Sequence, residues 1–305
     1  NLLPWRLQGM ARRPAVVTTF HDLRVPYLFP KAGLLRRWVT EALALWSDGA
    51  IATNDEDLKA LVRVAWRCLA RQPARYLVPI GSNINPAPPQ EYDRARWRER
   101  LQVAVNDLLL CYFGFLNESK GGDTLISTLA ELKKRRIQTR LLMIGGEVGD
   151  SDPTNAAYAR HIHELASELG VADRVIWTGY APAEQVTASL LAADVCVLPY
   201  RDGVSLRRGS LMAALAHGLP IVSTRPRSPV SELVDGENIL LVASDDAVGT
   251  ADAVEKLSQS PDLGRRLGYG SRELAQRFGW SGIAATTLGI YETLLRSREK
   301  LLATS

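Results

Sequence analysis

The chain has 305 residues, 46% of them apolar, which is enough for two domains that each bury a core. Its 37 Lys and Arg against 33 Asp and Glu give a net charge of +4, which suits an anionic small ligand or a membrane surface. This excess is too small to indicate nucleic-acid binding. No apolar run reaches about eighteen residues, so we expect no membrane-spanning helix.

The first third of the chain alternates β-rich and helix-forming segments. The patterns predict strands at 15–20, 49–52 and 76–80 and helices at 33–45 and 55–70. Asn54 or Asp55 is expected to cap the second helix. His21 follows the first strand directly, so it is either a cleft residue or a buried, hydrogen-bonded ring. A proline-rich segment at 85–90 then predicts a domain boundary.

The remainder repeats this alternation, which indicates α/β structure with a mainly parallel, doubly wound sheet. Strands are predicted at 108–113, 140–144, 175–177, 195–198, 221–223 and 239–242, and helices at 92–101, 124–134, 156–169, 183–191, 210–217, 247–258 and 262–278. A last amphipathic helix is predicted over 280–305, with Ile283, Leu288, Tyr291, Leu294 and Leu295 near one side.

The segment from Asp194 to Val242 organises the second part. It predicts a strand, a glycine-bearing loop, a helix ended by Gly218 and Pro220, and a second strand. Ligands of such sheets bind at the carboxyl ends of the strands, where a helix N-terminus attracts an anion. Arg207 and Arg208 sit at this helix start, so we predict phosphate binding there. A pair of solvated loop arginines is the alternative.

A second loop, 114–122, follows the strand at 108–113 and carries Lys120. Lysine at the carboxyl edge of a sheet can hold a diphosphate as a point charge. The alternative is an ordinary turn with a solvated lysine, since isolated glycine motifs are weak. His217 is expected to be either a cation at a helix end or a packed ring, and His161 and His163 point to different faces and are no metal pair.

The cysteines lack metal-ligand or redox spacing. We interpret Cys68, Cys111 and Cys196 as core thiols of a reducing compartment and expect a cytoplasmic protein. No Walker loop, Ser-His-Asp order or zinc spacing is present, so we expect no metal site.

The chain resembles the retaining group 1 glycosyltransferases of glycosyltransferase family four. The resemblance rests on the ordered motifs T-T-F-H-D-L, I-A-T-N-D-E-D-L, Y-F-G-F-L-N-E-S-K-G-G-D, L-L-M-I-G-G, R-V-I-W-T-G-Y, A-A-D-V-C-V-L-P-Y and A-L-A-H-G-L-P-I-V-S-T. It implies a GT-B fold of two Rossmann-like, doubly wound domains. We assign 1–85 to an incomplete acceptor-side domain, 86–279 to the donor domain and 280–305 to a helix that returns towards the first domain.

The resemblance implies transfer of a sugar from a nucleotide diphosphate sugar, with retention and without a metal or other cofactor. UDP and GDP are the expected nucleotides. We assign donor and phosphate binding to Gly114, Asn117, Lys120, Arg207, Gly209, Ser210 and Leu211. Catalysis is assigned to His21, Ser205 and Arg208, and base binding to Tyr180.

The sequence departs from the family pattern at three points. The family's paired glutamates fall on Ser205 and Ala213, and the arginine that often follows the first strand's glycine falls on Phe115. Asp202 is the nearest carboxylate that could take over a donor contact. The early strands of the acceptor-side domain have no match, so we expect a truncated first domain whose exposed strand edges favour oligomers.

The expected partners are the nucleotide-sugar donor and a glycan or lipid-linked acceptor. Aromatic and basic residues interleave in the first domain and suit peripheral contact with the inner membrane face, although solvated helix faces also explain them. Two alternatives to an active glycosyltransferase remain: a non-catalytic GT-B module that binds nucleotide or scaffolds a partner, and a nucleotide-sugar 2-epimerase, for which acid/base side chains are too few.

Overall fold

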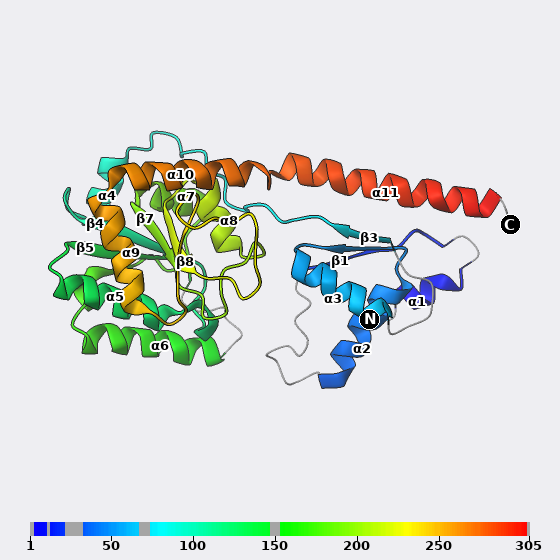
Figure 1. Cartoon of the computed structure of the whole chain (residues 1–305), viewed down its shortest axis with the longest axis horizontal. Coiled ribbons are helices and arrows are strands. Elements are labelled where there is room, and N and C mark those ends of the chain that lie inside the picture. The colour runs from blue at the N-terminus through cyan, green and yellow to red at the C-terminus, as the bar shows by residue number, and fades with distance from the viewer. Residues whose placement is uncertain (1–2, 11–12, 22–32, 67–73, 147–152, 304–305) are drawn as a thin grey trace. The chain divides into compact units, whose positions relative to one another are not determined.

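The computed structural model describes residues 3–10, 13–21, 33–66, 74–146 and 153–303. The chain forms two compact units, one of Asn1–Gly81 with Phe278–Ser305 and one of Ser82–Arg277 (Figure 1). Each unit has its own parallel sheet. Cys68 and seven of the first unit's aromatic or basic residues (Arg12, Arg24, Tyr27, Phe29, Lys31, Arg67 and Arg71) lie outside the described residues.

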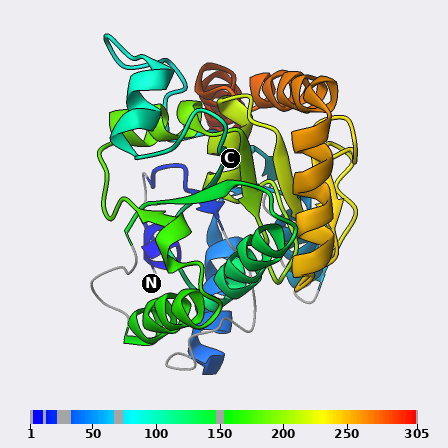
Figure 2. The ribbon, with the colours of Figure 1, turned by 90° about the vertical axis from the view of Figure 1, so that its left-hand side faces the viewer.

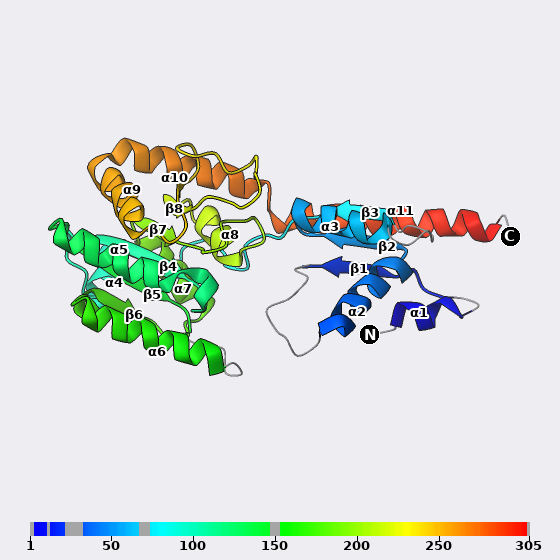
Figure 3. The ribbon, with the colours of Figure 1, turned by 60° about the horizontal axis from the view of Figure 1, so that its bottom comes forward.

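The first unit holds a three-stranded sheet in the order β1-β2-β3. Its elements are α1 (Leu3–Gln8), β1 (Val17–Phe20), α2 (Gly33–Trp46), β2 (Gly49–Ala52), α3 (Asp55–Trp66), β3 (Ala74–Leu77) and α11 (Trp280–Ala303) (Figure 3). Helix α1 was not predicted, and β3 begins two residues before the predicted strand. Asn54 is the cap of α3, because its side-chain oxygen accepts the Asp57 N–H at 2.9 Å.

Both faces of this small sheet are covered. Side chains alternate along β2, so Ala50 and Ala52 pack with Ala44 of α2 and Leu61 of α3. Ile51 lies between them, points the other way and packs against α11. The central strand β2 is therefore buried on both faces, with α2 and α3 on one face and α11 on the other.

The contact face of α11 differs from the predicted one. Ile290 and Leu294 are buried and Ile283 packs beside them, whereas Leu288, Tyr291 and Leu295 are 59%, 43% and 52% exposed. At about 100° per residue, 283, 290 and 294 share one side of the helix, and the other three lie on a different side. Among the described residues, no helix combines the length and apolarity needed to cross a bilayer.

The second unit holds a six-stranded sheet in the order β6-β5-β4-β7-β8-β9, in which every neighbouring pair is parallel. The strands are β4 (Leu108–Phe113), β5 (Thr139–Ile144), β6 (Val175–Trp177), β7 (Val195–Leu198), β8 (Ile221–Thr224) and β9 (Leu240–Val242). Both faces of β4 and β7 are buried, which explains their unbroken apolar sequences. Cys111 and Cys196 are core thiols on these strands.

Helices cover both faces of this sheet (Figures 1 and 2). They are α4 (Arg94–Arg100), α5 (Gly122–Lys134), α6 (Pro153–Glu168), α7 (Ala183–Ala192), α8 (Gly209–Ala216), α9 (Ala247–Gln259) and α10 (Pro261–Gln276), with 3-10 turns at Glu118–Lys120 and Ala172–Arg174. Helix α5 packs against α6 and α9, α8 against α10, and α4 against α7. The predicted α/β class with doubly wound parallel structure is confirmed.

A buried arginine ties α4 to the sheet. Arg98 donates to the carboxylate of Asp194 at 3.1 Å and to the carbonyl oxygens of Asp107 and Ala192 at 2.6 and 3.1 Å. The same carboxylate accepts the Leu109 N–H of β4 at 2.7 Å. Asp194 therefore joins α4, β4 and β7 through one side chain.

The strand order reverses between β4 and β7. Strands β5 and β6 continue on one side of this pair, and β8 and β9 on the other. In doubly wound sheets the crevice at such a switch point, beyond the carboxyl ends of the strands, is where ligands bind. The loops that follow β4 and β7 therefore define the candidate site.

Candidate functional site at the switch point of the second sheet

The loop after β4 is held close to the end of β7. Gly121 has φ +70°, and a Cβ at this position would lie 1.9 Å from the carbonyl oxygen of Pro199. Glycine therefore permits both the left-handed turn and the close approach. The preceding 3-10 turn, Glu118–Lys120, is thereby carried against the residues that follow β7.

Two cations lie near one buried ring. The Lys120 ammonium is 5.1 Å from the ring centroid of Tyr200, and the guanidinium carbon of Arg208 is 4.6 Å from it. Burial raises the pKa of the Tyr200 phenol, so this ring stays neutral. Its hydroxyl is 2.6 Å from Ser210 Oγ in the first turn of α8. Both cations therefore lie against the Tyr200 ring, next to the start of α8.

The start of α8 is open. Its first hydrogen bond runs from the Met212 N–H to the Arg208 carbonyl at 3.0 Å, so the N–H groups of Gly209, Ser210 and Leu211 have no partner within the helix. A Cβ on Gly209 would meet no atom within 4 Å. Free N–H groups, the helix dipole and nearby cations together favour an anion.

The loop between β7 and α8 contains further polar groups. Arg208 is ion-paired with Asp202, and the two side chains are only 12% and 8% exposed. Arg208 Nε and Ser205 Oγ are buried and have no hydrogen-bond partner in the described part of the chain. The Asp202 carboxylate, which could have taken over a donor contact, thus binds Arg208 in this structure. Buried donors without acceptors are expected where a ligand supplies the missing oxygen atoms.

Arg201, which the sequence patterns did not indicate as a site residue, bridges three carboxylates. Its guanidinium donates to Glu118 at 2.9 Å, to Asp245 at 3.0 Å and to Asp123. The Arg201 N–H also donates to the Ser119 carbonyl at 3.0 Å. The sequence signal that could have identified Arg201 is its position three residues after the end of β7, where ligands of such sheets bind.

The remaining predicted residues have varied surroundings. Asn117 Oδ1 accepts from Ser119 Oγ at 2.8 Å within the same loop, and Tyr180 is 86% exposed after β6. His21 is exposed at the end of β1 in the first unit. Phe115 is also exposed.

His217 is a packed ring. It is buried at the end of α8, and its Nδ1 lies 2.7 Å from the Ala213 carbonyl oxygen. Desolvation lowers the pKa of His217, which excludes the alternative of a helix-end cation near neutral pH. His163 packs on Trp177, and no cluster of metal-ligating side chains occurs among the described residues.

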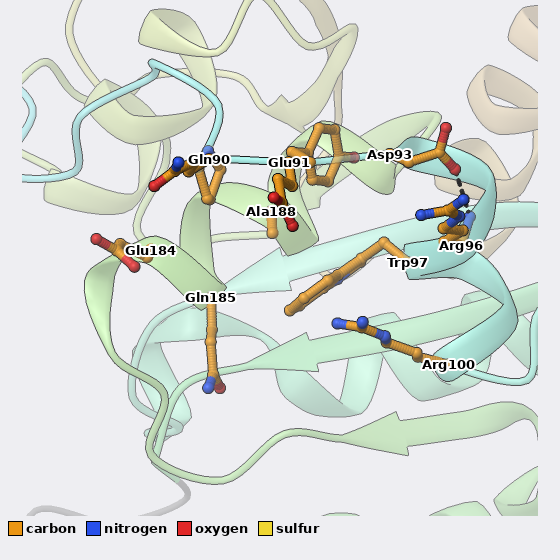
Figure 4. A pocket seen from close by; sticks show the side chains of 11 residues that line it. Gln90, Glu91, Asp93, Arg96, Trp97, Arg100, Glu184, Gln185 and Ala188 are labelled. Carbon is orange, nitrogen blue, oxygen red and sulfur yellow. Dashed lines mark hydrogen bonds between the residues drawn. The ribbon is translucent and has the colours of Figure 1, made fainter.

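A pocket of about 260 Å³ lies elsewhere in the second unit, between α4 and α7 (Figure 4). Trp97 forms one wall, with Arg100 beside its ring at 5.7 Å, and Glu184 and Gln185 lie across from it. None of the predicted site residues lines this pocket. The switch-point site is instead built from the loops after β4 and β7 and the start of α8.

Comparison with known proteins identifies the family. Residues 107–260 match the family described as "Glycosyl transferases group 1". The D-inositol 3-phosphate glycosyltransferase 2 of Catenulispora acidiphila is 30% identical over 84% of this chain and 58% of its own length. The corresponding enzyme of Corynebacterium diphtheriae is 28% identical over 94% of this chain and 67% of its own. The chain thus spans about six-tenths of the length of the curated relatives it matches.

Solved structures show the same fold. Sucrose-phosphate synthase from Thermosynechococcus elongatus has a TM-score of 0.77 and 26% identity, over 96% of this chain and 71% of that one. Anabaena HepE, solved with UDP and glucose, has a TM-score of 0.76 and 19% identity, over 91% and 71%. These likenesses confirm the GT-B fold class. The family match over half of the sequence establishes that the chain belongs to the group 1 glycosyltransferases.

Proposed function

We propose that this chain moves a sugar from a nucleotide diphosphate sugar to an acceptor, with retained anomeric configuration and without a metal ion. The observation that carries the proposal is the convergence of Lys120 and Arg208 on Tyr200 beside the open start of α8. It lies at the switch point, where ligands of doubly wound sheets bind.

The chemistry needs such a site. As the bond between the sugar and the diphosphate breaks, the leaving nucleoside diphosphate gains negative charge. Fixed cations and backbone N–H groups that face this charge stabilise the transition state, and they require no reorganisation during the reaction. In the proposal Lys120 and Arg207 contact the phosphates through their side chains. The backbone N–H groups of Gly209, Ser210 and Leu211 contact them as well. Gly114 and Asn117 line the donor site from the loop after β4.

The sugar, the base and the acceptor are assigned as part of the same proposal. Ser205 and Arg208 face the donor sugar from the α8 loop, since both keep a buried polar atom unbonded. We assign His21 to the donor sugar and Tyr180 to the nucleotide base. UDP is the first nucleotide to test, because HepE was solved with it. D-Inositol 3-phosphate, which the relatives' names give, is the first acceptor, followed by glycans and lipid-linked glycans.

The test is release of nucleoside diphosphate from UDP-, GDP- and ADP-sugars, with and without acceptor. We expect one donor class to turn over, and Lys120→Gln to slow turnover on the order of a hundred-fold because a cation is removed from the leaving group. Lys256→Gln, which changes an exposed lysine on α9, is the matched control and should leave the rate unchanged.

Two results would count against the proposal. Equal loss of activity in both lysine variants would show that the site assignment is wrong. Nucleotide binding without turnover of any donor would favour the non-catalytic GT-B module, for which the pairing of Arg208 with Asp202 is the supporting observation.

A further inference from the structure

Arg201 connects three segments that are distant in sequence. Its guanidinium binds Glu118 on the Lys120 turn, Asp123 in the first turn of α5, and Asp245 after β9. These carboxylates lie 83, 78 and 44 residues away along the chain. One side chain thus links the Lys120 turn and the first turn of α5 to the loop after β7.

Two more contacts hold the same junction. The Tyr158 hydroxyl of α6 donates to Asp123 Oδ1 at 2.8 Å, so the carboxylate that binds Arg201 is itself oriented. The Thr224 hydroxyl donates to the Tyr200 carbonyl at 2.6 Å and fixes the residue next to Arg201. The Lys120 turn is therefore held against the residues after β7 on two sides, by Arg201 and by the close contact of Gly121 with Pro199.

We infer that Arg201 is a positioning residue for diphosphate binding: it holds the Lys120 turn so that the ammonium lies over the Tyr200 ring, beside the start of α8. The inference rests on the proposed function. Arg201 acts through Lys120, because its own donors are bound to carboxylates that surround it. Loss of its side chain removes the ion pairs from the Lys120 turn, which then keeps only the bond from the Arg201 N–H to the Ser119 carbonyl and the contact of Gly121 with Pro199, while the charge of Lys120 itself remains.

The chain offers a matched control. Arg135 also binds three carboxylates: Glu131 at 3.2 Å, Asp252 at 2.6 Å and Glu255 at 2.8 Å. It joins α5 to α9, and its side chain is 22% exposed against 31% for Arg201. An arginine with a purely structural role would thus resemble Arg135.

The experiment compares Arg201→Met and Arg135→Met in UDP, GDP and ADP calorimetry, donor kinetics and thermal unfolding. For the nucleotide that the wild type binds, we expect Arg201→Met to weaken affinity on the order of ten-fold and to raise the donor KM more than it lowers kcat. Arg135→Met should leave the nucleotide affinity unchanged, although it should lower the unfolding temperature about as much as Arg201→Met does. Arg201→Lys should recover part of the affinity, because one charge can still reach one carboxylate.

A double-mutant cycle tests the route of the effect. In a Lys120→Gln background, Arg201→Met should cost less than two-fold in affinity, since the group it positions has already been removed. A full ten-fold loss in that background, or equal losses in Arg135→Met and Arg201→Met, would overturn the inference.

Hydrogen–deuterium exchange of the peptide 117–124 supplies a readout that does not depend on nucleotide. Arg201→Met should accelerate exchange there, and unchanged exchange would overturn the inference by itself. A folded wild type that binds no nucleoside diphosphate would instead refute the proposed function, and the exchange result would still decide whether Arg201 holds the Lys120 turn.

Discussion

Replacement of Gly121 by alanine tests the contact on which the site is built. A left-handed backbone costs a non-glycine residue about 1–2 kcal/mol. The new Cβ would also lie 1.9 Å from the Pro199 carbonyl oxygen, where an ordinary contact is at least 3.4 Å, so the two segments must separate by the difference of 1.5 Å. Such overpacking costs about 1–3 kcal/mol, which gives a total loss of about 2–5 kcal/mol.

Urea unfolding followed by tryptophan fluorescence measures this loss in Gly121→Ala. Gly264→Ala on α10 is the control, because the nearest atom to its Cβ is Pro220 Cγ at an ordinary 3.9 Å. It should be neutral or stabilising by up to about 1 kcal/mol. If Gly121→Ala unfolds at the same urea concentration as the wild type, the close approach of the two loops, and with it the position of Lys120, is wrong.

Three more substitutions probe the second unit. Gly209→Ala should leave stability within about 1 kcal/mol of wild type, since its Cβ meets no atom, but should weaken nucleoside diphosphate binding measured by calorimetry; unchanged binding would place the diphosphate elsewhere. Asp194→Ala should cost about 3 kcal/mol in urea unfolding, because it leaves the buried Arg98 charge without its partner; a loss below about 1 kcal/mol would contradict this. His217 has a folded-state pKa below the unfolded value of about 6.5, so its contribution to stability is complete above that pH and declines as the pH falls below it. His217→Gln should therefore flatten the dependence of urea midpoint on pH between about 7 and 5, and an unchanged dependence would show that His217 is not buried.

Much of the second unit could be predicted because its signals are local. Strand β4 has the bounds that its apolar run indicated, and α8 is followed by Gly218 at φ +64°, where a left-handed cap was expected. The loop glycines and Lys120 were likewise visible, since they follow a buried strand directly.

Long-range pairing could not be predicted in the same way. Nothing local links Arg201 to carboxylates 44 to 83 residues away, so its role required the sheet order. The predicted contact side of α11 was wrong because Leu288, Tyr291 and Leu295 are also large hydrophobic residues, yet they are exposed. Periodicity identified the helix, but the position of the sheet beneath it decides which side is buried.

The most direct test of the account is calorimetric titration of the wild type, Lys120→Gln and Arg208→Gln with UDP, GDP and ADP. We predict that one nucleotide binds the wild type and that each variant binds it at least ten-fold more weakly, since Lys120→Gln removes a charge assigned to the phosphates and Arg208→Gln removes the second cation beside Tyr200. A folded wild type that binds none of the three, or a Lys120→Gln variant that binds as tightly as the wild type, would contradict the assignment of the donor site.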